Sequence, residues 1–509
     1  MPTLNSLRTD LRHPLLAQIF VRGVLAFLMS GLLVSLLGYW IGSQQQAMIY
    51  LAAGAILACF VIAGLRQRTW ALIPLGWAFS NGISLLPFPL SIREIFVLLS
   101  VGAAVTYTVF RQSVSPGFWH GLDLALGFNM AWLAYTFVLH PVGLYSFGAD
   151  TVGGRPYWNI FVALMALWVM VRLCKSEKAA ARIPLYTLIG TGVYSLLNVI
   201  AYSIPSLTPI LFFATSAVDT GVYRSTLGAA QWSGIVRLQG LAPFGMTLVL
   251  YLCACYPTAS LFNPGRRRFY FLGLGLICIA LSGFRSDMLV AMTALCFGAW
   301  LHGGWRHFLI TTLVATLLFG LVTIGQGRLY ELPLSAQRAL SFLPGNWSAI
   351  AVEEARGSSE GRFAYWEKII KYKMIQNWWS GDGFGISQRD MLGMGQSFEE
   401  DIYTSGGYHN GPLSAIRYAG VIGLFLLYAL AIGAAVSAYR CVKACRGTML
   451  FPLAVFLAIQ LIWGPINYTF VFGGYDSYLP GLIFQLAALR VLLSLVENAR
   501  KTTVQTAVT

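Results

Sequence analysis

His409 is the residue of this chain best suited to acid–base chemistry. It stands in the segment Gly-Gly-Tyr-His-Asn-Gly-Pro at 406–412, directly before a long apolar run. An imidazole that is neutral near pH 7 can take up the proton of a sugar hydroxyl. It is also the only histidine in the polar stretch 325–414. A hydrogen-bonded structural histidine explains the same residue, so the sequence leaves two interpretations open.

Arginines near the ends of apolar runs offer a complementary chemistry. Guanidinium groups bind phosphate oxygens through paired, charge-assisted hydrogen bonds, and a diphosphate held in this way is a better leaving group. Such arginines would supply the positive charge that a metal ion supplies in other enzymes. The candidates are Arg224, Arg237, Arg285 and Arg362.

Plainer explanations exist for some of these arginines. Arg285 lies deep in apolar sequence, where a charge is costly and a functional role is favoured, but an ion pair with Asp287 at a helix start is the alternative. Arg224 and Arg237, taken singly, are compatible with solvated surface charges in the segment 206–239.

Trp366 and Asn410 complete the candidate substrate-binding residues. Trp366 can line a path for sugar rings, although such tryptophans more often belong to the aromatic belt at a membrane interface. The amide of Asn410 can orient a substrate or the loop but cannot take up a proton. An imidazole, several arginines and aromatic side chains together fit glycosyl transfer from a polyprenyl-diphosphate donor without a metal ion.

The elements that must position these residues are membrane helices. Hydrophobic residues make up 57% of the chain and charged residues only 10%, and the mean hydropathy is +0.67. No soluble domain of 509 residues keeps its surface in water with so few charges. Apolar runs of roughly 17–25 residues recur along the chain, each about the length of a membrane-spanning helix. We therefore expect an all-α, polytopic integral membrane protein.

About fourteen spans and one large polar loop are predicted from these runs. The first run is long enough to stay in the membrane, so no cleaved signal peptide is expected. The polar loop, residues 325–414, separates the eleventh span from the twelfth. The predicted spans are residues 23–41, 47–65, 70–86, 94–110, 122–140, 157–173, 184–205, 240–258, 269–283, 288–301, 308–324, 415–438, 450–470 and 477–496.

Basic residues set the predicted orientation. The arginine- and lysine-rich linkers at 66–68, 172–182, 266–268 and 440–446 fall on one side of the predicted bundle, together with both termini. The positive-inside rule places that side in the cytoplasm, so the polar loop faces outward. This loop holds ten of the nineteen acidic residues in a chain of net charge +15. The positive charge is thus a topology signal, and no nucleic-acid partner is expected.

The stretch 269–301 decides this topology. A single long helix there would place the basic linker 440–446 outward, against the charge rule. We therefore predict two short spans that are broken at Ser-Gly-Phe-Arg-Ser-Asp, residues 282–287. Arg285 then lies at the outer turn.

A surface helix is predicted inside the polar loop. Helical spacing of apolar residues begins after Ser359, the expected N-cap, and continues through Phe363, Trp366, Ile370 and Met374. The segment 380–385, Ser-Gly-Asp-Gly-Phe-Gly, has the composition of a turn.

No cofactor is expected. The eight cysteines lie in predicted spans or cytoplasmic linkers without accompanying histidines, so neither a disulfide nor a metal site is predicted. The sequence contains no Walker loop, HExxH motif or nucleotide fingerprint. It also shows no internal repeat of the kind that marks many transporters.

Three pieces of the second half resemble the O-antigen ligase and polymerase superfamily of bacterial envelope enzymes. Leu-Ser-Gly-Phe-Arg-Ser at 281–286 resembles the superfamily's serine-glycine-x-arginine turn between two spans. Gly-Arg-x-x-x-Trp from 361, with Asn-Trp-x-x-Gly-x-Gly-x-Gly from 377, resembles the start of its large periplasmic loop. His409-Asn410, followed by Gly-Val-Ile-Gly-Leu at 420–424, resembles the end of that loop. Two departures are Trp379, where the superfamily usually has proline, and a span count above the typical dozen.

The resemblance implies transfer of an undecaprenyl-diphosphate-linked glycan at the periplasmic face of the bacterial inner membrane. The acceptor would be the lipid A core for a ligase, or another lipid-linked repeat for an O-antigen or exopolysaccharide polymerase. The sequence does not separate the two. Membrane lipid and components of a polysaccharide export system are expected partners.

Three regions are expected on this basis. Residues 206–450 would be the catalytic region, between the N-terminal transmembrane helices of 1–205 and the C-terminal helices and cytoplasmic tail of 451–509. The alternative class is a transporter or flippase of lipid-linked saccharides. That class explains many spans and outward arginines but not a long one-sided loop.

Overall fold

The computed structural model of the chain describes residues 60–82, 90–110, 120–141, 154–211, 235–384, 406–471 and 473–508. The chain divides into two units, residues 1–66 with 85–88 and residues 67–84 with 89–509. The candidate site and the helices that carry it belong to the second unit.

Helices make up the fold of the described residues, which contain no β-strand beyond two isolated bridges. An apolar run becomes a helix in lipid because a helix satisfies its backbone N–H and C=O groups within its own segment. The all-α class is thus confirmed. The helices that cover predicted spans are α4 (Ile92–Phe110), α5 (Gly121–Leu139), α6 (Gly154–Leu173), α8 (Ile183–Ser203), α11 (Ala242–Cys255), α13 (Arg267–Ser282), α14 (Arg285–Gly303), α15 (Trp305–Gly325), α20 (Gly411–Ala444), α21 (Phe451–Phe470) and α22 (Tyr475–Val508).

The predicted span 70–86 is wrong as one continuous helix. Helical structure there is confined to the end of a 3-10 turn, η1 (Arg66–Ala71), and the short helix α3 (Leu72–Gly76). The chain then turns, and the N–H of Arg93 donates to the carbonyl of Phe79 at 3.2 Å. The described backbone after Gly76 therefore bonds to the start of α4 instead of continuing a helix.

Seven helices among the described residues are long and apolar enough to cross a membrane. Helix α15 illustrates the lipid-facing kind, because Leu313, Leu317 and Leu321 are each more than half exposed. The chain is therefore a polytopic membrane protein, while the count of fourteen spans stays a prediction. Span 23–41 and most of span 47–65 lie outside the described residues. The seven helical stretches are Gly121–Leu139, Gly154–Leu173, Glu177–Ser203, Trp305–Gly325, Gly411–Ala444, Phe451–Phe470 and Tyr475–Arg500.

Helix α20 is central to one group of helices. It packs against α5, α21 and α22, and α22 also packs against α6. Fully buried alanines on α20, among them Ala431 and Ala434, allow neighbouring helices to approach closely. The amide of Asn129 on α5 donates to the carbonyl of Leu426 on α20 at 2.9 Å. Small side chains and interhelical hydrogen bonds of this kind hold helices together where lipid weakens the hydrophobic effect.

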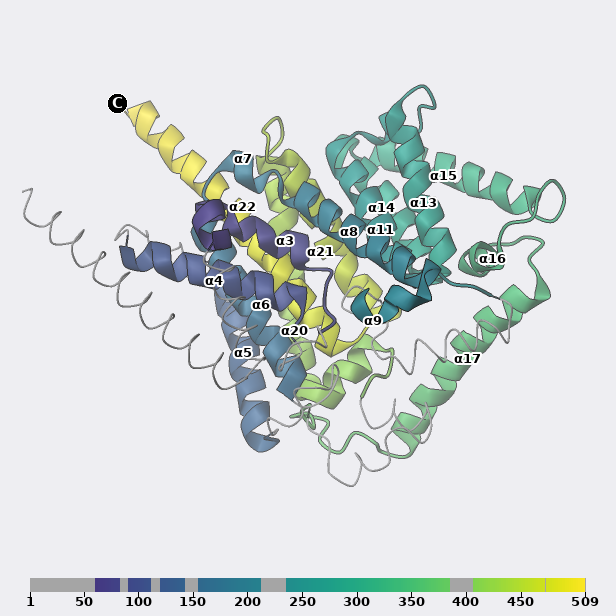
Figure 1. The fold of residues 1–509 in the computed structure, drawn as a ribbon, viewed down its shortest axis with the longest axis horizontal. Coiled ribbons are helices and arrows are strands. Elements are labelled where there is room, and N and C mark those ends of the chain that lie inside the picture. The colour runs from purple at the N-terminus through teal and green to yellow at the C-terminus, as the bar shows by residue number, and fades with distance from the viewer. Residues whose placement is uncertain are drawn as a thin grey trace, which may run out of the picture. The chain divides into compact units, whose positions relative to one another are not determined.

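Helices α11, α13 and α14 form the group that carries the candidate site (Figure 1). Gly245 on α11 faces Gly275 on α13 so closely that a Cβ on Gly245 would lie 2.7 Å from the Gly275 carbonyl oxygen. After α15, the chain forms the short helix α16 (Leu334–Leu340), which packs against α13 and α14, and then the long helix α17 (Ala349–Lys371). The polar stretch thus returns to the α13–α14 turn.

Candidate active site

A sharp turn between α13 and α14 presents Arg285. Helix α13 ends at Ser282, Gly283 has a φ of 73°, and Phe284 is extended before α14 begins at Arg285. Glycine adopts this left-handed conformation without the Cβ penalty, which suits it to end a helix. The predicted break at 282–287 is confirmed.

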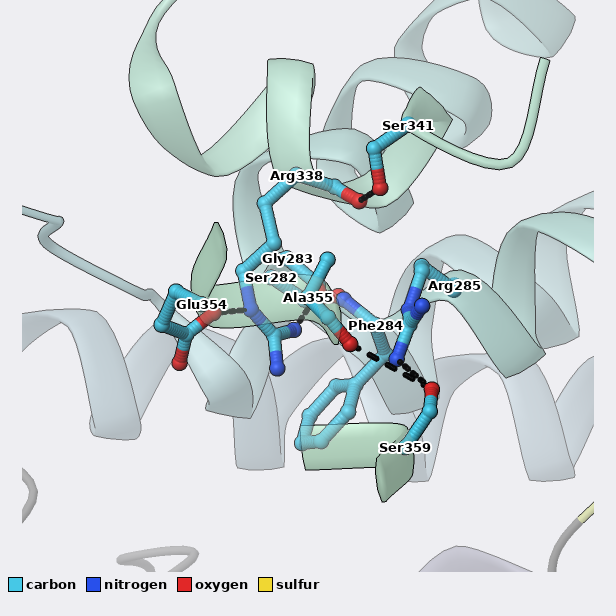
Figure 2. A network of polar contacts seen from close by, with 9 residues as sticks. All are labelled: Ser282, Gly283, Phe284, Arg285, Arg338, Ser341, Glu354, Ala355 and Ser359. Atoms are coloured by element: carbon cyan, nitrogen blue, oxygen red, sulfur yellow. Dashed lines mark hydrogen bonds and ion pairs between the residues drawn. The ribbon is translucent and has the colours of Figure 1, made fainter. Parts of the chain in front are cut away.

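Arg285 reaches from this turn to α17. Its Nη2 donates to the Ser359 hydroxyl at 3.0 Å, and that hydroxyl donates to the carbonyl of Ala355 at 3.3 Å (Figure 2). Within the described part of the chain no ion pair joins Arg285 to Asp287. The alternative explanation of Arg285, as the partner of Asp287 at a helix start, therefore does not hold.

The expected N-cap at Ser359 is wrong. Helix α17 follows Ser348 and Ser359 lies in its interior. The helix begins earlier because Ala351 and Ala355, one turn apart, place small side chains on a buried face. This extension carries Ser359 to Arg285.

Arg237 approaches the same turn from the loop before α11. The N–H of Leu238 donates to the carbonyl of Leu281 at 3.1 Å, which holds the loop against the end of α13. The Arg237 guanidinium lies 4.7 Å from the centre of the Phe284 ring. Burial lowers the pKa of Arg237 below its usual value, and repulsion by Arg285 lowers it further.

Arg338 on α16 is a fourth arginine of the cluster, which the sequence interpretation did not single out. It is 5% exposed. Its Nη1 donates to the Gly283 carbonyl and its Nε pairs with the carboxylate of Glu354 on α17 (Figure 2). Its pKa is lowered to about 9, mainly by burial and then by the charges of Arg237, Arg285 and Arg362. A signal was present in the sequence, because Arg338 is the one charged residue in Leu-Ser-Ala-Gln-Arg-Ala-Leu.

Helix α17 connects this cluster to the histidine loop. The pKa of Arg362 is lowered by burial and by the charges of Arg285 and Arg237. One turn further along, the indole N–H of Trp366 donates to the carbonyl of Tyr408 at 2.9 Å. Trp366 is thus packed against the loop, and contact with a sugar stays a prediction for this residue.

His409 has a strained backbone conformation and lies within electrostatic reach of Arg362. Its φ is 51°, which is uncommon for a residue with a Cβ. Burial lowers its pKa from 6.5 to about 4, and the nearby charge of Arg362 contributes to the shift. The imidazole is therefore neutral at pH 7, as a proton acceptor must be.

Asn410 begins the helix that follows. Its side-chain oxygen accepts the N–H of Leu413 at 3.0 Å, which makes Asn410 the N-cap of α20. The preceding residue, Tyr408, is buried among Ile369, Ile375 and other apolar side chains. Both neighbours of His409 are thus fixed, one by packing and the other by capping.

The glycine-rich turn of the polar stretch docks on a break in α20. Gly420 has a φ of 70° inside that helix, and a Cβ there would lie 2.1 Å from the carbonyl oxygen of Trp379. The N–H of Val421 donates to the Trp378 carbonyl at 2.8 Å. Asp382 pairs with Arg417 of α20 at 2.9 Å. These contacts fix the segment around Trp378 to Asp382 to helix α20. The arginines of the α13–α14 turn are held by other contacts.

Three of the predicted arginines meet in the structure, and Arg224 lies outside the described residues. Arg237, Arg285 and Arg362 come from three separate segments, and Arg362 brings His409 into the same electrostatic environment. Four guanidinium groups, including Arg338, repel one another in partly buried surroundings. Such an arrangement favours an anion with several oxygens, and the neutral imidazole beside it can accept a proton.

Comparison with protein families agrees with this arrangement. Residues 270–428 match the family model described as O-antigen ligase. The match extends from α13 through the arginine turn, α16, α17 and His409 into α20, and it confirms the resemblance to the O-antigen ligase and polymerase superfamily. Arg224 and Arg237 precede the matched residues. A search of curated proteins finds no match to this chain.

Proposed function

We propose that the chain is a metal-independent glycosyltransferase that moves a glycan from an undecaprenyl-diphosphate carrier to a sugar hydroxyl at the periplasmic face. The observation that carries the proposal is the convergence of four arginines and one neutral histidine at the junction of membrane helices and polar stretch. The family match supports glycan transfer as the general activity.

The arginines bind the diphosphate in this proposal. Each phosphate group presents oxygens that a guanidinium engages through two parallel bonds, and low local polarity strengthens the attraction. Negative charge grows on the diphosphate as the glycosidic bond breaks. Arg237, Arg285 and Arg362 stabilise that charge, so the transition state gains more than the ground state.

His409 acts as the general base on the acceptor hydroxyl. Without donor, burial and the Arg362 charge keep its pKa at about 4. A bound diphosphate brings negative charge beside the imidazole, and this favours the imidazolium and raises its pKa. The base therefore becomes stronger when the donor is in place.

The acceptor separates a ligase from a polymerase, and both use the same site. A deletion strain distinguishes them. Lipid A core without attached chains, together with accumulation of long lipid-linked chains, indicates a ligase, whereas products with a single repeat indicate a polymerase. A normal glycan profile in the deletion strain would contradict both. The strain also supplies the lipid-linked donor for the assays below.

The orientation is tested with a reporter that is active only in the periplasm. Fused after Ser358 or Ser397, the reporter should be active, and fused after Arg268 or Lys443 it should be silent. Reversal of either pair would place the arginines and His409 in the cytoplasm, where the proposed donor and acceptor are not presented. Inactivation by EDTA that Mg²⁺ or Mn²⁺ reverses would contradict activation of the leaving group by arginine alone.

A further inference from the structure

Two polar contacts join the α13–α14 turn to α17. In one, Arg285 of the turn donates to Ser359. In the other, Arg338 donates to the Gly283 carbonyl and pairs with Glu354, so it contacts the turn and α17 at once. Glu354 and Ser359 are five residues apart, which is about 7.5 Å along a helix axis. Figure 2 shows both contacts, with the turn between α16 and α17.

The Arg338 guanidinium is held by protein acceptors. Its Nε and Nη1 are already engaged by protein acceptors, and the residue is 5% exposed. The carbonyl that it holds belongs to Gly283, the left-handed residue two positions before Arg285. This hydrogen bond fixes the orientation of the peptide group between Gly283 and Phe284. It thereby sets the direction in which the chain continues to Arg285.

We propose that Arg338, in its ion pair with Glu354, is a positioning residue that sets the direction of Arg285 and docks α17 on the turn. The inference rests on the proposed function, in which Arg285 and Arg362 engage the diphosphate. Arg285 follows the held peptide and Arg362 lies on the docked helix, so Arg338, through its hydrogen bond and its ion pair, orders both. Arg338 itself does not bind the phosphates.

The test compares Arg338→Gln, Glu354→Gln and the double variant in the full-length protein. Turnover is measured with undecaprenyl-diphosphate-linked glycan from the deletion strain, and affinity with undecaprenyl diphosphate alone. Each single variant should lower kcat on the order of 10–100-fold, because a small displacement of a catalytic group has an effect of this size. The dissociation constant of undecaprenyl diphosphate should change less than about threefold. The double variant should be no slower than Arg338→Gln, since that change already removes the ion pair that Glu354→Gln breaks.

Arg356→Gln is the matched control. Arg356 lies on the same helix, two residues from Glu354, and pairs with Glu360 at 2.6 Å, but both side chains are exposed. Its replacement removes the same charge without touching the turn, so kcat should stay normal. Arg338→Lys should recover part of the kcat that Arg338→Gln loses, because an ammonium keeps the pairing with Glu354 but lacks the planar fork.

Two results would overturn the inference. One is an unchanged kcat in Arg338→Gln or in Glu354→Gln. The other is a tenfold or larger loss of undecaprenyl-diphosphate affinity confined to Arg338→Gln, roughly 1.4 kcal/mol, which would make Arg338 a phosphate ligand. If Arg338→Gln does not accumulate in the membrane, Glu354→Gln tests the same pair from α17.

Arg285→Ala and His409→Ala belong in the same assay. If both keep normal turnover, the proposed function fails, and the inference that rests on it fails too. If both are inactive while Arg338→Gln and Glu354→Gln are normal, only the positioning role is wrong.

Discussion

Two groups of buried or half-buried arginines in this chain differ in the charges around them. Arg490 on α22 donates to both carboxylate oxygens of Asp123, through Nε at 2.8 Å and Nη2 at 2.7 Å. Arg155 pairs with Glu94 at 2.7 Å, and both side chains are almost fully buried. In these pairs one arginine meets one carboxylate.

The arginine cluster at the α13–α14 turn brings several guanidinium groups together instead. The charges of Arg237, Arg285 and Arg362 all act on Arg338 and lower its pKa, while Glu354 pairs with Arg338 and the carboxylate of Asp287 acts on Arg237. Bringing like charges together in partly buried surroundings is costly unless an opposite charge is supplied. We propose that the matched pairs are structural connections, whereas the arginine cluster binds an anionic substrate.

The largest expected effect comes from Arg285→Ala, which should abolish detectable glycan transfer while the protein still inserts and folds. Loss of one charge-stabilising donor lowers rates by about 10²–10³-fold. The same change also removes the hydrogen bond that joins the turn to Ser359 of α17, so the combined loss should exceed that of any other single change. Arg285→Lys should restore only part of the activity, because a point charge lacks the fork geometry. Transfer is measured with lipid-linked glycan in membranes that contain equal amounts of protein. Full activity in Arg285→Ala would make the cluster as structural as the matched pairs.

His409→Ala should lower the rate by about 10²–10⁴-fold, the usual contribution of a general base. Donor binding should survive, because arginines hold the diphosphate. In the parent protein, protonation of His409 removes activity as pH falls, and with a pKa of about 4 the acidic limb of kcat/KM should lie well below pH 6.5. The acidic limb of the kcat profile should lie at higher pH than that of kcat/KM, since the bound diphosphate favours the imidazolium form of His409. An acidic limb that persists unchanged in His409→Ala would assign it to another group.

Arg490→Met tests the matched side of the comparison. Removing one partner of a buried ion pair leaves Asp123 uncompensated, which costs about 3–5 kcal/mol of stability. The melting temperature in detergent should fall, while the kcat of the protein that remains folded should not change. A variant with normal stability and lost turnover would reverse the roles assigned to the two groups.

Arg362→Ala and Arg237→Ala should each give smaller losses than Arg285→Ala, roughly tenfold, which is about 1.4 kcal/mol. The two variants should differ in the pH dependence of their activity. Because the charge of Arg362 contributes to the lowered pKa of His409, its removal should shift the acidic limb of kcat/KM to higher pH. Arg237→Ala serves as the control and should leave the limb in place. Identical profiles for the two variants would show that Arg362 does not act on His409.

Asn410→Ala should have the smallest effect. The side-chain oxygen caps α20, and loss of an N-cap costs about 0.5–2 kcal/mol of stability. Activity should weaken, but the shape of the pH profile should stay the same because an amide does not titrate. Thermal unfolding measures the loss of stability, and the pH dependence of turnover shows whether the profile is unchanged. A changed profile would mean that Asn410 sets the basicity of His409.

Several features were predictable because they are local. Scarcity of charge and the length of the apolar runs predicted a helical membrane protein. The glycine in Ser-Gly-Phe-Arg predicted the α13–α14 break, since a left-handed residue ends a helix. The same method failed at 70–86, where contacts with α4 replace a continuous helix, and at Ser359, where burial extends α17 to an earlier start.

The sequence by itself determined that the chain lies in a membrane and that Arg285 stands at a break between two helices. Only the tertiary structure decided which charges meet. Arg237 and Arg362 are far apart along the chain, and Arg338 has no pattern that links it to Gly283 or Glu354. The periodicity of apolar residues shows which side of a single helix is buried. Which arginines come together depends on how separate helices pack. That packing therefore decides which charges surround each arginine. The same packing separates the arginines that hold helices together from those that we propose to bind substrate.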